Sequence, residues 1–227
     1  MLFVLIVVAL LAVIIGPSWW VRRVMARYSE PADRYPGTGA ELVEHLANEL
    51  NIPDLRVEQT DQGDHYDPET GIVRLTEDKY QGRSLTAITV AAHEVGHALQ
   101  DRDNYLPLRW RSKLVRGTRG IERVGAWMML GAPVLGLITR APRLGLLAVL
   151  GGLLSIGSSI PVHLLTLPTE FDASFNRALP ILRERILKPV DQPHAKRILT
   201  AAALTYVAGS LMALLNLARW AALLRRF

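Results

Sequence analysis

The fold of this chain is organised around the stretch Ala91-Ala92-His93-Glu94-Val95-Gly96-His97-Ala98-Leu99-Gln100. It contains the pattern His-Glu-x-x-His, whose two histidines can bind one metal ion only if the stretch is a helix. Residues four apart on a helix lie one turn apart on the same face, so His93 and His97 can direct their imidazole nitrogens at one point. Residues 84–92 contain neither glycine nor proline, which favours the helix. Two such imidazoles suit a zinc ion, and Glu94 is placed to act as general base on the water beside it. The alternative is a pair of core histidines on an amphipathic helix.

The composition predicts a protein that is partly in a membrane and partly in water. Of the 227 residues 50% are hydrophobic, and the mean hydropathy of +0.19 is high for a soluble protein and low for a chain wholly inside lipid. The chain has no cysteine, so nitrogen and oxygen atoms must hold the zinc. The net charge is +5, but the arginines cluster beside apolar runs, which favours anionic lipid headgroups over nucleic acid as the partner.

Four apolar runs are long enough, or nearly so, to cross a bilayer as helices. They are residues 1–21, 124–139, 144–167 and 198–217. A pair of tryptophans ends the first run at a position typical of the membrane interface, and Arg22 and Arg23 follow it. By the positive-inside rule the N-terminus is then outside the cell and the zinc motif faces the cytoplasm. We therefore expect a multi-pass protein of the cell membrane.

These runs divide the chain into expected segments. A transmembrane anchor (1–21) is followed by a cytoplasmic zincin-like domain that contains the motif helix (22–120). A transmembrane hairpin (121–167), a cytoplasmic helical segment (168–197) and a C-terminal transmembrane helix with its tail (198–227) complete the chain. The expected fold class is mainly α: an integral membrane protein with about four transmembrane helices and a small α+β zincin-like metalloprotease domain.

A short helix and two strands are expected ahead of the motif. Residues 38–50 have apolar residues at helical spacing, and Thr38 with Glu41 matches a capping box. Residues 55–59 and 71–75 are typical of strands. A strand just before a zinc-binding helix can pair through its free edge with an extended peptide substrate, although a plain structural strand is the alternative. The candidate residues of this substrate edge strand are Ile72, Val73, Arg74, Leu75 and Thr76.

A catalytic zinc site needs a third protein ligand, which must come from the same side of the membrane. Acidic residues are few after His97. The best placed is Glu170, which follows the third apolar run and so returns to the cytoplasmic side. A structural role for this acid at a membrane edge is the alternative.

Three stretches of the chain also carry a resemblance to a known family. Asp64–Pro68, Ala92–Gln100 and Glu170–Ser174 resemble the bacterial membrane-bound neutral zinc metallopeptidases of the YugP-like group. The resemblance covers most of the chain, from about residue 28 onward. It implies a gluzincin-like site, similar to those of HtpX-like and CAAX prenyl proteases, in which a glutamate on a later helix is the third zinc ligand.

The family pattern carries over to this chain residue by residue. The ligands that it implies for one zinc ion per chain are His93, His97 and Glu170. It implies that Glu94 is the base. Similar sites often have an aspartate four positions after the ligand glutamate, where this chain has Ser174, whose hydroxyl can still hydrogen-bond a ligand imidazole. Asp172 is the nearby alternative for this supporting role.

The donor that stabilises the oxyanion of the reaction is not assignable from spacing. The candidates are His163, His194, Arg197 and Tyr206. Tyr206 lies in an apolar run, so its alternative role is packing. The alternatives for His163 are packing and a proton-linked role.

The function expected from these residues is hydrolysis of peptide bonds by a zinc-activated water, with membrane protein quality control or regulated proteolysis as its setting. The expected partners are a peptide or membrane-protein substrate, membrane lipid and a regulatory protein, without nucleic acid. Three alternatives stay open: an intramembrane protease, a membrane scaffold or chaperone that keeps the motif without catalysis, and a zinc hydrolase of lipids or other amides. The apolar stretch around the motif is bounded by Arg83 and Asp101 and is too short to span a membrane, which argues against the first.

Overall fold

The computed structural model describes residues 16–139, 150–151 and 160–205, and it divides into two compact units. The first unit holds the described residues up to Arg109 and those from Leu167 onward, so it contains the His-Glu-x-x-His motif. The second unit holds the described residues between Trp110 and Thr166.

Helix α2 (Gly39–Glu49) begins at a capping box, which confirms the prediction for this segment. The Thr38 hydroxyl accepts a hydrogen bond from the backbone N–H of Glu41 (3.2 Å), and the Glu41 carboxylate accepts one from the backbone N–H of Thr38 (2.8 Å). The apolar side of α2, which includes Val43 and Leu46, is buried, and the helix packs against the motif helix.

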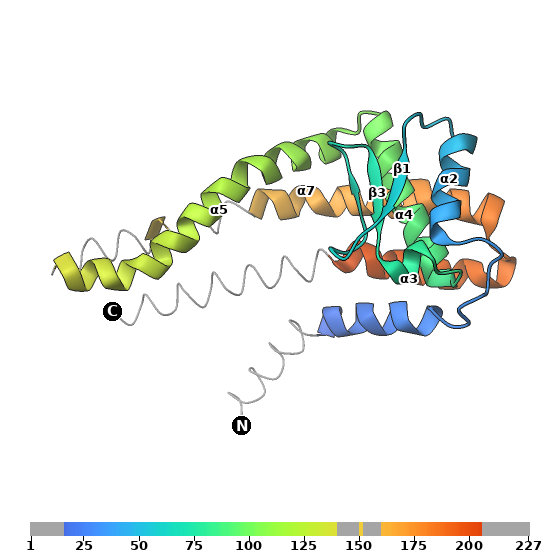
Figure 1. Cartoon of the computed structure of the whole chain (residues 1–227), viewed down its shortest axis with the longest axis horizontal. Coiled ribbons are helices and arrows are strands. Elements are labelled where there is room, and N and C mark those ends of the chain that lie inside the picture. Colours follow the sequence, from blue (N-terminus) through green and yellow to red (C-terminus); the bar gives the residue numbers. More distant parts are fainter. Residues whose placement is uncertain (1–15, 140–149, 152–159, 206–227) are drawn as a thin grey trace, which may run out of the picture. The chain divides into compact units, whose positions relative to one another are not determined.

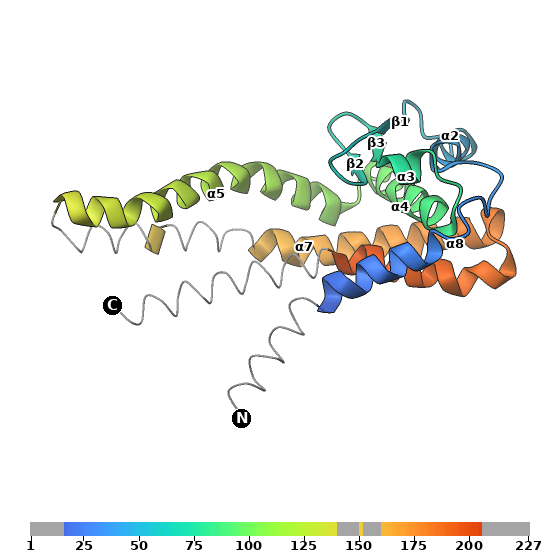
Figure 2. The same ribbon diagram turned by 60° about the horizontal axis from the view of Figure 1, so that its bottom comes forward.

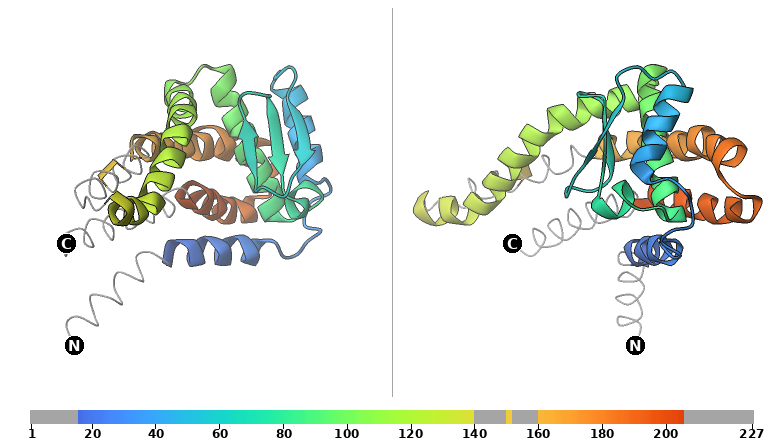
Figure 3. Two further views of the ribbon diagram at one scale, coloured as in Figure 1. Left: turned by 60° about the vertical axis from the view of Figure 1, so that its left-hand side comes forward. Right: turned by 45° about the vertical axis from the view of Figure 1, so that its right-hand side comes forward.

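A small sheet of three strands precedes the motif helix. The strands are β1 (Arg56–Gln59), β2 (His65–Asp67) and β3 (Ile72–Leu75), in the order β1-β3-β2. Strand β1 runs parallel to β3, while β2 runs antiparallel to it with Tyr66 opposite Val73. The left view of Figure 3 shows the three strands side by side.

The substrate edge strand predicted at residues 72–76 is wrong, because β3 is the central strand of this sheet. Both of its edges are already paired, one with β1 and the other with β2, so an added peptide has no free edge there. The sequence between the two predicted strands is rich in turn-forming residues, yet His65–Asp67 forms the third strand. The free edges of the sheet therefore belong to β1 and β2.

Helix α4 (Leu85–Arg102) carries the motif and is the centre of the first unit. The Ser84 hydroxyl caps it by accepting a hydrogen bond from the backbone N–H of Ala87 (3.2 Å). Every residue from Leu85 to Gln100 is buried. The helix contacts β2 and β3 as well as the helical segment that follows α7, and Figures 1 and 2 show it between the sheet and that segment. The predicted motif helix is confirmed.

Several short helical segments, one before α4 and the others at the end of α7 and after it, also belong to the first unit. They are α3 (Glu77–Tyr80), the end of α7 (Ile160–Phe171), the π-helical η1 (Asp172–Ala178), α8 (Leu179–Ile181), the π-helical η2 (Leu182–Ile186) and the 3₁₀ helix η3 (Pro189–Asp191). Further helices occupy residues 16–28 and 192–205.

The buried Asp191 connects the two chain segments that make up the first unit. Asp191 is fully buried and accepts hydrogen bonds from Arg34, whose Nε lies 2.9 Å from it, and from the Tyr35 hydroxyl at 2.7 Å. Arg34 forms an ion pair with the second oxygen of the same carboxylate. The loop before α2 is thereby fixed to the segment before the helix at 192–205.

The second unit is built on helix α5 (Leu106–Thr139), a single helix of 34 residues that begins in the first unit. Its N-terminal half is rich in arginine, and the apolar run predicted as a span at 124–139 is the continuation of this charged half. The apolar part of this helix, residues 124–139, is shorter than the roughly 20 apolar residues that a helix needs to cross a bilayer.

The prediction of an integral membrane protein with four transmembrane helices is wrong, because the described helices do not support it. Within residues 16–139, 150–151 and 160–205, none of the helices combines the length and the apolar character needed to span a bilayer. Large parts of the predicted spans, at residues 1–15, 140–149, 152–159 and 206–217, lie outside the described residues. The expected division of the chain into segments stays a prediction.

Candidate metal centre

Two histidines from α4 and one glutamate from the end of α7 converge inside the first unit. The Nε2 atoms of His93 and His97 lie 3.2 Å and 3.4 Å from the same carboxylate oxygen, Oε2 of Glu170. One ligand atom from each residue lies within 4.8 Å of the others, and all three residues are buried. In the described part of the chain, this is the group of histidine and acidic side chains that could hold a metal ion.

A glycine inside the motif lets the two segments approach so closely. Gly96 lies between the histidines on α4, and a Cβ atom built on it would lie 2.6 Å from the backbone carbonyl oxygen of Ala173 in η1. No side chain larger than hydrogen fits this contact without movement of η1. Because η1 begins two residues after Glu170, the contact at Gly96 sets the position of the carboxylate relative to the histidines.

Each histidine is held by a hydrogen bond at the ring nitrogen that faces away from Glu170. The Ser174 hydroxyl lies 3.1 Å from Nδ1 of His93, so it makes the hydrogen bond to a motif imidazole that was predicted for this residue. The side-chain oxygen of Gln100 lies 3.0 Å from Nδ1 of His97. The sequence analysis missed Gln100, although its place three positions after His97 on a helix is a signal that could have found it.

The environment keeps the Glu170 carboxylate charged. Burial alone would raise its pKa, but the electrostatic interactions and hydrogen bonds that Glu170 makes with the imidazoles of His97 and His93 outweigh burial and hold the pKa below its usual range. The side chain has no exposed surface. Burying an ionised carboxylate is unfavourable unless positive charge compensates it, which a divalent cation at this place supplies.

Glu94 is different from Glu170 although both are buried. The pKa of Glu94 is raised to about 7, chiefly by burial; the electrostatic interaction with His93 lowers it, and the neighbouring carboxylates of Glu170 and Asp64 raise it. The backbone of Tyr66 in β2, a strand that packs against α4, also lowers this pKa. A carboxylate with a pKa near neutrality can both accept and release a proton under physiological conditions.

The donor set fits zinc. Two imidazoles and one carboxylate are the ligands of a common class of catalytic zinc sites, which leave one position for water or substrate. The hydrogen bonds to both Nδ1 atoms leave both Nε2 atoms directed at one place. These residues could therefore hold one zinc ion.

The structure does not bring the other predicted site residues into this group. Asp172 contacts Gln100 rather than a histidine of the motif, His194 stacks near the Tyr28 ring, and Arg197 is exposed. His163 lies on α7 in the second unit, and Tyr206 lies outside the described residues. The donor for the oxyanion stays unassigned.

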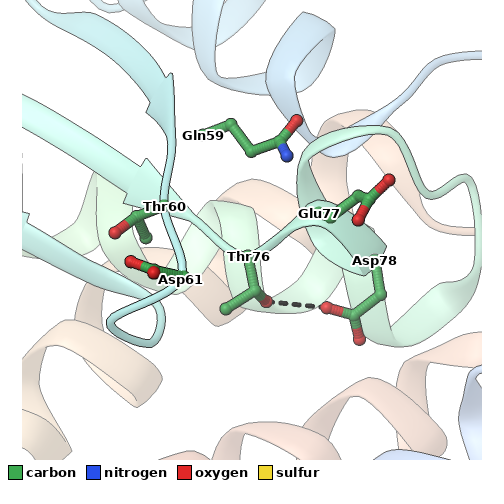
Figure 4. A pocket seen from close by; sticks show the side chains of 6 residues that line it. All are labelled: Gln59, Thr60, Asp61, Thr76, Glu77 and Asp78. Atoms are coloured by element: carbon green, nitrogen blue, oxygen red, sulfur yellow. Dashed lines mark hydrogen bonds between the residues drawn. The ribbon is translucent and has the colours of Figure 1, made fainter.

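A separate hollow of about 840 Å³ lies where β1 and β3 end and α3 begins (Figure 4). Its lining is polar and acidic: Gln59, Thr60, Asp61, Thr76, Glu77 and Asp78. The Thr76 hydroxyl is hydrogen-bonded to the Asp78 carboxylate in this lining (2.7 Å). None of the three residues of the His-His-Glu group lines this hollow.

Comparison with known proteins gives the class to which this fold and site belong. The chain belongs to the family described as "Putative neutral zinc metallopeptidase", whose match extends over residues 2–225. This confirms the resemblance found in the sequence and the prediction of zinc as the cofactor.

A curated relative is the "Putative membrane protease YugP" of Bacillus subtilis (strain 168). It is 34% identical over 223 residues, which cover 97% of this chain and 95% of the relative. No solved structure matches the chain.

Proposed function

We propose that this protein is a zinc-dependent peptidase in which His93, His97 and Glu170 hold one zinc ion and Glu94 is the general base. One observation carries the proposal. The carboxylate of Glu170, which follows His93 by 77 positions in the chain, lies within 3.4 Å of the Nε2 atoms of both motif histidines. A scaffold without catalysis has no need for this convergence of buried polar groups, which is costly without a bound cation.

The chemistry follows from the groups in place. Zinc, when bound, supplies a Lewis acid that polarises a peptide carbonyl and makes water more acidic. Glu94 accepts a proton from the attacking water while the oxygen of that water bonds to the carbonyl carbon, and it then donates the proton to the amine as the C–N bond breaks. Its pKa of about 7, raised by burial, suits it to both transfers.

The free edge of β2 supports a peptide as the substrate. Strand β2 is paired on one side only, it packs against α4, and the backbone of its residue Tyr66 lowers the pKa of the base. An extended peptide that pairs with this edge would have its backbone beside Glu94. The strand thus takes the role that the sequence suggested for residues 72–76.

The setting of the reaction is proposed from the relative and from exposed aromatic residues. The relative is named a membrane protease. Trp19 and Trp110 are more than half exposed, and each has a basic side chain over its ring, Arg23 at 5.2 Å and Lys113 at 5.6 Å. Tryptophan beside a basic residue is typical of a membrane interface. We propose that the protein acts at the cytoplasmic membrane surface on peptides or membrane proteins, in contact with lipid and under the control of a regulatory protein.

Metal analysis combined with peptide hydrolysis by the Glu94→Gln variant tests the proposed activity. The variant should keep its zinc and lose peptide turnover by about 100-fold or more, because it cannot accept the proton. Glu184→Gln, the same change at an exposed position of η2, should behave as wild type. A wild-type protein without zinc would identify a scaffold instead, and equal turnover by both variants would remove Glu94 from the mechanism.

A further inference from the structure

The side-chain amide of Gln100 has only one orientation that satisfies its surroundings. Its nitrogen lies 2.8 Å from the backbone carbonyl oxygen of Thr169 and 2.8 Å from Oδ2 of Asp172. Both partners are hydrogen-bond acceptors, and only the NH₂ group of the amide can donate to them. The amide oxygen must therefore face the third neighbour, Nδ1 of His97, at 3.0 Å.

This orientation determines which nitrogen of His97 carries the proton. An amide oxygen only accepts hydrogen bonds, so Nδ1 of His97 must be protonated. In the neutral ring the lone pair is then on Nε2, the atom that lies 3.4 Å from the Glu170 carboxylate and is directed at the proposed metal position. A neutral histidine with Nδ1 protonated is the form that binds a metal through Nε2.

The same amide also fixes the segment that delivers the third ligand. Thr169, whose carbonyl accepts from Gln100, directly precedes Glu170. Asp172 lies two positions beyond Glu170 and is itself held by Arg177, whose Nε donates to it at 2.8 Å. Arg177 also donates to Asp103, the residue that ends α4, at 2.6 Å. One buried side chain thus connects the helix of the histidines to both sides of the glutamate.

We propose that Gln100 is a positioning residue that orients His97 by accepting a hydrogen bond from its Nδ1–H and holds Glu170 in register with α4. This inference rests on the proposed zinc site. Gln100 has no exposed surface, so water does not compete for these hydrogen bonds. Ser174 contributes less at His93, because a hydroxyl can either donate or accept and so does not fix the protonation of the ring by itself.

The first experiment compares Gln100→Met with Gln192→Met. Methionine keeps the length of the side chain and removes its hydrogen bonds, and Gln192 lies in the first unit away from the metal centre. The zinc dissociation constant, measured by competition with a chelator, should rise about 10- to 100-fold in Gln100→Met and stay unchanged in the control. In the cobalt(II)-loaded protein the visible d–d spectrum should also change, which reports on ligand geometry independently of activity.

A second pair of variants covers the case in which Gln100→Met does not fold. Gln100→Glu keeps an acceptor for His97 but places oxygen against the Asp172 carboxylate, so it should bind zinc more weakly than wild type. Adding Asp172→Asn provides a new amide nitrogen at position 172 that can donate to the carboxylate at position 100. The double variant should bind zinc more tightly than Gln100→Glu alone.

The outcomes separate this inference from the proposed function. If wild type binds zinc and Gln100→Met, folded by circular dichroism, binds it equally well with the same cobalt spectrum, Gln100 is not a positioning residue and the zinc site stands. A double variant that binds more weakly than both of its single variants overturns the inference in the same way. If wild type itself binds no zinc, the proposed function fails first.

Discussion

The Ser174 hydroxyl lies 3.1 Å from Nδ1 of His93 and 3.4 Å from the backbone carbonyl oxygen of Leu199, so it links the motif helix to the helix at residues 192–205. When the hydroxyl donates to Leu199, it accepts from Nδ1–H of His93. This leaves Nε2 of His93 with its lone pair toward Glu170, as in His97.

Ser174→Ala should therefore weaken zinc binding by up to about 10-fold without loss of the fold, because one of the two histidines loses its orienting partner. Chelator competition measures the change. Ser29→Ala, which removes a hydroxyl that donates a hydrogen bond to the Met25 carbonyl (3.0 Å) and contacts none of the three proposed ligands, is the matched control. An effect of equal size in both variants would contradict the orienting role.

Gly96→Ala should destabilise the protein by about 1–3 kcal/mol, since the new methyl group would overlap the Ala173 carbonyl and push η1 away. Zinc affinity should fall with stability, because η1 moves together with Glu170. Urea unfolding and metal titration measure the two effects. Gly117→Ala in α5, where a Cβ atom meets nothing within 4 Å, should not destabilise, and a destabilisation as large as that at Gly96 would refute the explanation.

Thr89→Val should leave stability unchanged or raise it by about 1 kcal/mol. The Thr89 hydroxyl is fully buried and lacks a hydrogen-bond partner among the residues that the structure describes. Removing an unsatisfied buried polar atom at constant shape avoids its desolvation cost. Thr86→Val, one turn earlier on α4, removes a hydrogen bond to the Met25 carbonyl (2.9 Å) and should destabilise by about 1 kcal/mol. Thermal unfolding of the two variants measures both changes in stability. A larger loss of stability in Thr89→Val than in Thr86→Val would show that the Thr89 hydroxyl stabilises the fold.

The stability of the first unit should fall in acid through Asp191. Burial alone would raise the pKa of this carboxyl, but the hydrogen bonds from Arg34 and Tyr35 outweigh it and hold the pKa below its ordinary value. The stabilisation is therefore present above the ordinary pKa of about 4 and is lost as the pH falls toward the folded-state pKa. Urea unfolding should show a large difference between wild type and Asp191→Asn at pH 7 and a smaller one at pH 3. A difference that stays constant with pH, as expected for the exposed control Asp61→Asn, would exclude this origin.

Local patterns in the sequence predicted the parts of the structure that depend on local forces. The capping box at Thr38 and the helical face of His93 and His97 are set by residues three or four positions apart, and both are confirmed. Gln100 obeys the same spacing, but its role depends on Thr169 and Asp172, which no local pattern connects to it.

Predictions that needed long-range information fared differently. The pairing of β3 on both sides depends on a third strand at residues 65–67, whose turn-like composition hides it. The four spans were inferred from the hydropathy of separate runs, whereas α5 joins an arginine-rich segment and an apolar one in one helix. The convergence of Glu170 with the histidines was expected from the family resemblance, and the contact at Gly96 explains it physically.

The separation of 77 positions between His93 and Glu170 has a consequence for synthesis of the protein. The chain leaves the ribosome from its N-terminus, so the two imidazoles and the base emerge well before the acid that completes the set. A nascent chain that ends before residue 170 has the complete motif and an incomplete metal centre. The proposed metal centre can therefore assemble only once most of the polypeptide has been translated.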